Sequence, residues 1–128
     1  MVKVLVIEDE PKVRIILDML LRPQGYDVIL ADNGWTGLQL YRQEHPDVML
    51  LDLKLPKLDG VTVLKQIRSV DLKLPVIVLT GNNTPETERE VRALGASEFI
   101  VKGSSLHSLE ATLKRLLKTP TPTPSSPP

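Results

Sequence analysis

The feature that most constrains the fold is a short apolar run, residues 48–51, which stops abruptly at Asp52. The run shows no polar alternation, and the loop after it contains Pro56 and Gly60. This pattern is typical of a strand buried on both faces, and such strands usually belong to parallel sheets. Asp52 would then leave the core at the strand's carboxyl end, the edge where α/β proteins bind ligands. Taken alone, such a residue would more often be a solvated loop carboxylate.

Apolar segments alternate with segments of helical periodicity along the whole chain. The predicted strands are residues 2–7, 26–31, 48–51, 75–79 and 98–101, and the predicted helices begin near residues 11, 34, 58, 85 and 104. Strict alternation indicates an α/β fold with right-handed crossovers and helices on both faces of the sheet. We therefore expect a doubly wound, five-stranded parallel sheet in the flavodoxin-like order 2-1-3-4-5.

The helices differ in the apolar faces that they offer. The first should bury one stripe, Val13, Ile16, Leu17 and Leu20, and the last shows Leu106, Leu109, Leu113 and Leu116 on one side. The fourth, which Thr84 and Pro85 begin, is mostly Glu, Arg and Thr. With so few apolar anchors, it is a candidate mobile element.

Composition favours a single domain over residues 1–118. The 16 basic residues equal the 16 acidic ones, so nothing indicates binding to nucleic acid or to an anionic membrane. There is no Cys, which excludes disulfides and thiol catalysis. The first apolar run is too short for a signal peptide or a membrane span, so a cytoplasmic protein is expected. Residues 119–128 should form a disordered tail or a linker, because their sequence, TPTPTPSSPP, is rich in proline and has no apolar anchor.

Reactive side chains follow four of the predicted strands. They are Glu8 and Asp9, then Asp52, Thr80 and Lys102. In the expected strand order the four strands are neighbours, so all five side chains should meet at one edge. Two carboxylates about 4 Å apart repel by roughly 4 kcal/mol at an effective dielectric of about 20, so a compensating cation is expected. Hard oxygen ligands select Mg²⁺ or Ca²⁺, and a few carboxylates with water and a phosphate oxygen are the usual arrangement around Mg²⁺.

A cation, a lysine and a hydroxyl group around one carboxylate are the parts needed for phosphoryl transfer, with Asp52 as the nucleophile. Each part also has a plain structural interpretation. Glu8 and Asp9 could simply favour a helix start, Lys102 could be solvated, and Phe99 could be a core residue. The joint pattern is much less expected by chance than any single member.

Three other functions fit parts of the pattern. A phosphatase of the haloacid dehalogenase type would need a second Asp at position 54, where this chain has Lys54. A nucleotide- or flavin-binding module would need a glycine-rich loop after the first strand, where this chain has Glu8, Asp9 and Glu10. A pure interaction domain would not require the full set of reactive side chains.

Four segments together resemble a known family. IEDE at 7–10, LLDLKLPKLDG at 50–60, VIVLTG at 76–81 and FIVKG at 99–103 are similar to the receiver domain of response regulators in two-component signalling. The resemblance covers residues 2–118. It implies a phospho-acceptor domain, not an enzyme acting on other substrates, in which Asp52 takes a phosphoryl group from a histidine kinase or a phosphotransfer protein.

The resemblance also implies roles for the surrounding residues. Asp9, Asp52 and the Lys54 backbone carbonyl would bind Mg²⁺ directly, and Glu8 would bind it through water. Lys102 would pair with the phosphoryl group, while Thr80 moves to donate a hydrogen bond to it and Phe99 follows inward. The face formed by the fourth helix, fifth strand and fifth helix would then act on a downstream target or effector domain, or form a homodimer.

Two positions depart from the family pattern. Gly103 stands where the family usually has Pro, and Gly81 stands where it often has Ala. The first puts the stiffness of the loop after Lys102 in question, and the second implies freer access to Asp52. Lys54 and Asn82 occupy positions that influence how fast the family loses its phosphoryl group.

Overall fold

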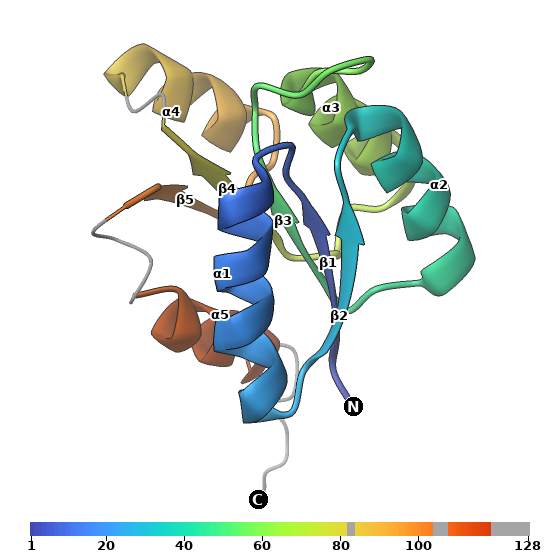
Figure 1. The fold of residues 1–128 in the computed structure, drawn as a ribbon. Helices are drawn as coiled ribbons and strands as arrows, with labels where there is room; N and C mark the ends of the chain where they lie inside the picture. The colour runs from blue at the N-terminus through green and yellow to red at the C-terminus, as the bar shows by residue number, and fades with distance from the viewer. Residues whose placement is uncertain (82–83, 104–107, 119–128) are drawn as a thin grey trace, which may run out of the picture.

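The computed structural model describes residues 1–81, 84–103 and 108–118, and it contains one parallel sheet with helices on both faces (Figure 1). The strands are β1 (Lys3–Ile7), β2 (Asp27–Ala31), β3 (Val48–Leu51), β4 (Val76–Thr80) and β5 (Glu98–Val101). The helices are α1 (Pro11–Leu21), the short 3-10 helix η1 (Arg22–Gln24), α2 (Gly34–Glu44), α3 (Gly60–Val70), α4 (Pro85–Ala93) and α5 (Leu109–Lys118). The strand order is β2-β1-β3-β4-β5, which confirms the predicted topology.

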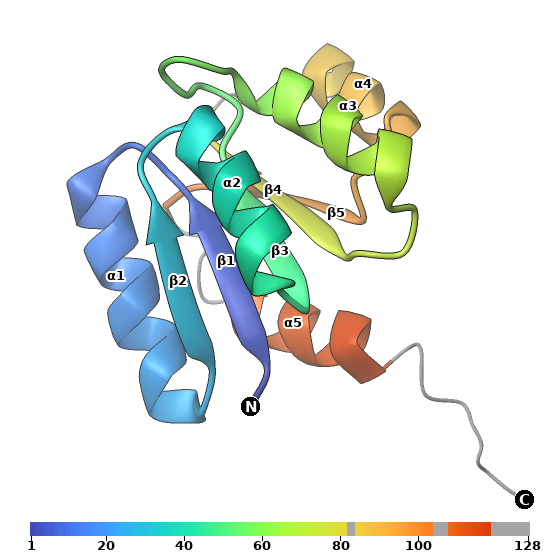
Figure 2. The same ribbon diagram turned by 90° about the vertical axis from the view of Figure 1, so that its right-hand side faces the viewer.

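Two apolar layers hold the helices to the sheet. Helices α1 and α5 cover one face, and α2, α3 and α4 cover the other (Figures 1 and 2). Alternate residues of each strand serve the two layers, so that in β3 Met49 and Leu51 face one side while Val48 and Leu50 face the other. All four are buried, as expected for a strand covered on both faces. In the described part of the chain, no helix combines the length and apolar character needed to cross a bilayer.

The helices are anchored very unevenly. Helix α3 buries Val63, Leu64 and Ile67 completely, whereas Val91 is the buried residue of α4. The scarcity of anchors predicted for the fourth helix is therefore confirmed. The apolar face predicted for the first helix was partly wrong, because Ile16 is 48% exposed and Leu21 is buried instead.

Side-chain caps explain where three helices begin. The side-chain oxygens of Asn33, Asp59 and Thr84 accept hydrogen bonds from the backbone N–H three residues later, at 2.8, 2.9 and 3.1 Å. These bonds satisfy backbone donors that a helix N-terminus leaves free. The second helix was predicted to begin near residue 34 and the fourth at Thr84 and Pro85, and the structure confirms both starts. The predicted start of the last helix near Ser104, with Leu106, and the predicted tail at 119–128 lie outside the described residues.

Two glycines fix the loop between β3 and α3. A Cβ atom on Gly34 would overlap with the backbone carbonyl of Leu58, and a Cβ on Gly60 would overlap with the backbone carbonyl of Asp52. In addition, the N–H of Gly60 donates a 2.8 Å hydrogen bond to the carbonyl of Leu53. The loop therefore folds back tightly over the carboxyl end of β3, directly beside Asp52.

Candidate phosphoacceptor site

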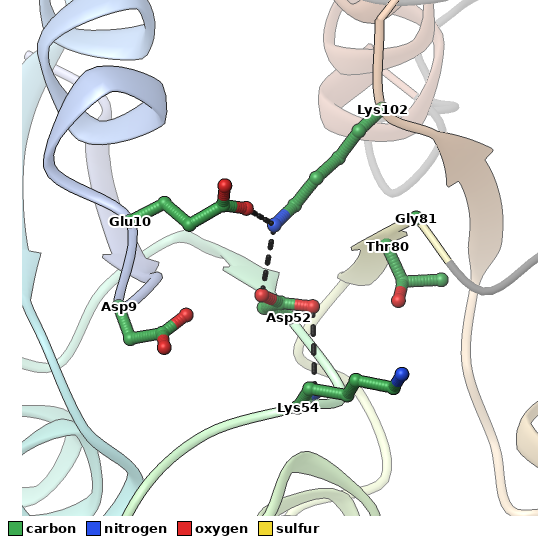
Figure 3. Close-up of a pocket in the computed structure, with 7 residues that line it drawn as sticks. All are labelled: Asp9, Glu10, Asp52, Lys54, Thr80, Gly81 and Lys102. Atoms are coloured by element: carbon green, nitrogen blue, oxygen red, sulfur yellow. Dashed lines mark hydrogen bonds and ion pairs between the residues drawn. The ribbon is translucent and has the colours of Figure 1, made fainter.

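Four of the five reactive side chains predicted from the strand ends line a cavity of about 550 Å³ at the carboxyl edge of the sheet (Figure 3). Its lining residues are Asp9, Glu10, Asp52, Lys54, Thr80, Gly81 and Lys102. Glu8 is buried next to the cavity and contacts Lys102. Phe99 does not line the cavity; it is half-buried and packs against the apolar layer under α2, α3 and α4.

Backbone hydrogen bonds of the sheet bring these residues together. The N–H of Asp52 donates to the carbonyl of Ile7 at 3.0 Å, and the N–H of Lys102 donates to the carbonyl of Thr80 at 3.0 Å. Each bond extends strand pairing by one residue, so each side chain leaves the core beside its neighbour. The edge is thus assembled by the ends of β1, β3, β4 and β5, as the predicted strand order requires.

Lys102 is the centre of the site. Its ammonium nitrogen, Nζ, lies 3.0 Å from both carboxylate oxygens of Glu8, 2.9 Å from Asp52 Oδ2 and 2.5 Å from Glu10 Oε1. The other carboxylate oxygen of Asp52 receives a long 3.4 Å hydrogen bond from the backbone N–H of Lys54. Figure 3 shows the side chains of Glu10 and Lys102 meeting above Asp52.

Burial and crowding set the electrostatics of the site. Glu8 and Asp52 are only 1% and 3% exposed. Burial raises the pKa of Glu8 to about 7, despite hydrogen bonds from Glu10 N–H and Lys102 that act in the opposite direction. Burial alone would lower the pKa of Lys102, but its hydrogen bonds to Glu10, Asp52 and Glu8 raise the pKa above the usual value. Three carboxylates therefore share one ammonium group, which leaves an excess of negative charge.

The residues present fit a Mg²⁺ ion. Carboxylate oxygens of Glu8, Glu10 and Asp52 lie within 4.8 Å of one another, and such hard oxygen donors are the ligands that Mg²⁺ prefers. Glu8 Oε1 is buried and, although it lies 3.0 Å from Lys102 Nζ, it accepts no hydrogen bond from the described residues. A further cation or a water molecule would satisfy this acceptor. Asp9 lines the same cavity but does not belong to this group of three.

Sequence reasoning missed the role of Glu10. This residue precedes Pro11 at the start of α1, where an acidic side chain looks like a favourable helix start. Its side chain points instead toward Lys102, a residue 92 positions away in the sequence. The run of three acidic residues at 8–10 was the available signal, but it does not indicate which of the side chains reaches Lys102.

The backbone after Lys102 differs from the one that the family pattern implies. Gly103 has a φ of 95°, in the left-handed region that proline cannot adopt because its ring fixes φ near −65°. Glycine at this position therefore permits a turn that the usual proline would prevent. Gly81, on the other side of the cavity, has open space where a Cβ would lie.

Comparison with known proteins identifies the family. Residues 4–114 match the family model described as the response regulator receiver domain. The chain belongs to the response regulator receiver domain family. This receiver domain is 35% identical over 116 residues to the regulatory protein AtoC of Escherichia coli. The matched region covers 91% of this chain and 25% of AtoC. It is 40% identical over 116 residues to the probable transcriptional regulator ycf27 of Porphyridium aerugineum, covering 91% of this chain and 48% of that protein.

Solved structures agree with the sequence relatives. The structure of the Francisella response regulator 1452 receiver domain superposes with a TM-score of 0.89 at 28% identity, covering 94% of this chain and 100% of that one. Phosphorylation on an aspartate and Mg²⁺ binding through acidic residues are general properties of receiver domains, which act as phospho-acceptor signalling domains in two-component systems. The chain spans about a quarter to half of the length of the two curated relatives named above.

Proposed function

We propose that this receiver domain accepts a phosphoryl group on Asp52 from a phosphohistidine of a sensor histidine kinase or phosphotransfer protein. The observation that carries the proposal is the position of the Asp52 carboxylate. It lies at the end of β3 in an accessible cavity, 2.9 Å from the Lys102 ammonium group, with Thr80 on the neighbouring strand lining the same cavity. We further propose that the domain catalyses only its own phosphorylation and dephosphorylation, in the cytoplasm.

The chemistry follows from these positions. A carboxylate oxygen of Asp52 forms a bond to phosphorus while the P–N bond of the phosphohistidine breaks, and the electron pair of that bond stays on the imidazole nitrogen. Lys102 provides positive charge next to the oxygens that receive negative charge. Mg²⁺, when bound, supplies further charge neutralisation. Asp9, Asp52 and the Lys54 carbonyl would hold it directly, and Glu8 through water.

Phosphorylation would then shift the domain between two arrangements. A phosphoryl group adds about −1.5 to −2 charge and new hydrogen-bond acceptors, so Thr80 and Lys102 would turn toward it. Phe99 lies one strand away on β5, paired with Val78, and would follow Thr80 inward. Helix α4 packs on the same apolar layer as Phe99 and has Val91 as its buried anchor, which supports its role as the moving element.

The output surface in this proposal is formed by α4, β5 and α5. Salt bridges join these elements, since Glu98 on β5 contacts Arg92 of α4 at 3.4 Å and Arg115 of α5 at 2.7 Å. We propose that this surface controls a downstream target protein or an effector domain, or mediates a homodimer. The longer relatives, one of them named as a probable transcriptional regulator, support an effector that acts on transcription.

Incubation with acetyl phosphate and Mg²⁺ tests the phosphoacceptor. The intact mass should increase by one phosphoryl group in the wild-type protein and stay unchanged in Asp52→Ala. Asp47→Ala is a matched control, because Asp47 is an exposed carboxylate before β3, at the opposite edge of the sheet. Labelling of Asp52→Ala to the wild-type level would contradict the assignment.

The proposed switch is tested with beryllofluoride and Mg²⁺, which should shift the NMR signals of Phe99. An unchanged spectrum of Phe99 would contradict the switch.

A further inference from the structure

We propose that Glu10 is a positioning residue, which holds Lys102 in the unphosphorylated domain and has to release it when Asp52 carries a phosphoryl group. The inference rests on the phosphoacceptor function proposed above. Its basis is the contact between the Glu10 carboxylate and the Lys102 ammonium group, which Figure 3 shows beside the contact of Lys102 with Asp52.

The hydrogen-bond donors of Lys102 are all in use. An ammonium group has three N–H donors, and the described partners take three: Glu8 Oε2 at 3.0 Å, Asp52 Oδ2 at 2.9 Å and Glu10 Oε1 at 2.5 Å. A phosphoryl oxygen on Asp52 therefore has to replace one of these acceptors. The side chains of Glu8 and Asp52 are 2% and 4% exposed, whereas that of Glu10 is 59% exposed. Glu10 is thus the partner that can leave without disturbing the core.

The side chain of Glu10 is free to move while its backbone is fixed. Its N–H donates to Glu8 Oε2 and its carbonyl accepts from the N–H of Arg14, both at 3.0 Å. Glu10 occupies the N-cap position of α1, but its side chain accepts no capping hydrogen bond from the described residues. The contact with Lys102 is therefore not a by-product of helix capping. After release, the carboxylate remains near the N-terminus of α1, where negative charge is favoured.

Glu10 should oppose phosphorylation in two ways. It competes with the phosphoryl group for Lys102, and it adds negative charge to an edge that must receive about −1.5 to −2 more. Replacing the carboxylate with a neutral amide removes most of both effects. Partly exposed ion pairs contribute modestly, so Glu10→Gln is expected to bind the phosphoryl mimic beryllofluoride about threefold more tightly than wild type.

The test is a beryllofluoride titration followed by NMR, at a Mg²⁺ concentration that saturates every variant, so that changes in metal affinity do not contribute. Glu44→Gln is the matched control, because it removes the same charge as Glu10→Gln. Glu44 also forms an ion pair, at 3.3 Å with Lys3, but at the opposite edge of the sheet. We expect about threefold tighter binding for Glu10→Gln and wild-type binding for Glu44→Gln.

A second measurement reports on Lys102 directly. In protein free of Mg²⁺ and beryllofluoride, the ¹⁵N signal of the Lys102 ammonium group should shift and exchange faster with water in Glu10→Gln, but not in Glu44→Gln. Equal or weaker beryllofluoride binding by Glu10→Gln, or an unchanged Lys102 signal, would overturn the positioning role. A wild-type protein that binds no beryllofluoride would instead overturn the proposed function, and with it this inference.

Discussion

A half-buried carboxylate and a buried carboxylate at opposite edges of the sheet have very different surroundings. At the amino edge, Asp71 follows α3, and its oxygens accept hydrogen bonds from Lys73 N–H at 2.9 Å, Leu74 N–H at 3.0 Å and Tyr41 OH at 3.0 Å. At the carboxyl edge, Glu8 keeps one oxygen without a hydrogen-bond partner in the described residues and shares Lys102 with two other carboxylates.

The pKa values of the two groups move in opposite directions as a result. Burial alone would raise the pKa of Asp71, but the hydrogen bonds from Lys73, Leu74 and Tyr41 lower it below the usual value. Burial raises the pKa of Glu8 to about 7. The amino edge therefore stabilises the fold, whereas the carboxyl edge retains unsatisfied negative charge that a cation and a phosphoryl group can use.

The largest expected difference between the edges is in mutant stability. Asp71→Ala should lower the free energy of unfolding by about 3 kcal/mol, because three donors lose their acceptor. Asp52→Asn should leave the stability of the metal-free protein unchanged or raise it, because it relieves repulsion within the acidic group. Urea denaturation measures both changes. Similar losses in the two variants would show that the edges do not differ in this way.

The stability of the metal-free protein should also depend on pH with opposite slopes. Glu8 binds its proton more tightly in the folded state, so stability should fall as pH rises from about 4.5 to about 7, by roughly 1 kcal/mol per pH unit. Asp71 has a lowered pKa, so its contribution should be lost only as pH falls through the acid range. Urea denaturation at a series of pH values measures both slopes. Glu8→Gln should flatten the slope between about pH 4.5 and about pH 7, and Asp71→Ala should flatten the slope in the acid range. If stability still falls between about pH 4.5 and about pH 7 in Glu8→Gln, a group other than Glu8 causes that fall.

Mg²⁺ should stabilise the protein through the carboxyl edge alone. At a free concentration of about ten times its dissociation constant, an ion that binds only the folded state adds about 1.4 kcal/mol. Thermal unfolding with and without Mg²⁺, at matched ionic strength, measures this increment. Asp71→Ala should retain the increment, and Asp52→Asn should lose most of it. Retention by Asp52→Asn would place the ion elsewhere.

The smallest effect concerns backbone strain, which the two edges share. His45 at the end of α2 has a φ of 50°, and Lys57 in the loop after β3 has a φ of 68°. Both are in the left-handed region that favours glycine. Replacing either residue with glycine, as His45→Gly or Lys57→Gly, should change the free energy of unfolding by less than about 1 kcal/mol. The two changes should have the same sign, because in both the relief of backbone strain is partly offset by the higher entropy of the unfolded chain. A large gain at Lys57 alone, in urea denaturation, would show that the carboxyl edge also stores strain.

The fold and much of the site were predictable because both are encoded locally. Each strand is a run of apolar residues that ends in a polar one, and the alternation with helices restricts the strand order. The carboxyl ends of β1, β3 and β4 therefore placed Glu8, Asp52 and Thr80 correctly at one edge. Which oxygens bind Mg²⁺, and whether Phe99 follows Thr80, remain predictions.

Features that depend on side-chain reach were not predictable. The apolar positions of α1 form more than one stripe, since Ile15, Ile16 and Met19 are all exposed, and spacing alone cannot tell which stripe meets the sheet. The contact of Glu10 with Lys102 depends on how two loops approach each other after folding. A pattern of residue types carries no information about such a distance.

The tight loop after β3 has a practical consequence for interpreting mutational scans. Gly34 and Gly60 bear no functional group, yet any side chain there would collide with the backbone on either side of the loop that follows Asp52. A saturation screen scored by signalling output should rank both positions among the least tolerant of the domain. Intolerance at such sites reports the shape of a turn, and screens for altered kinase specificity gain most by leaving these two codons fixed.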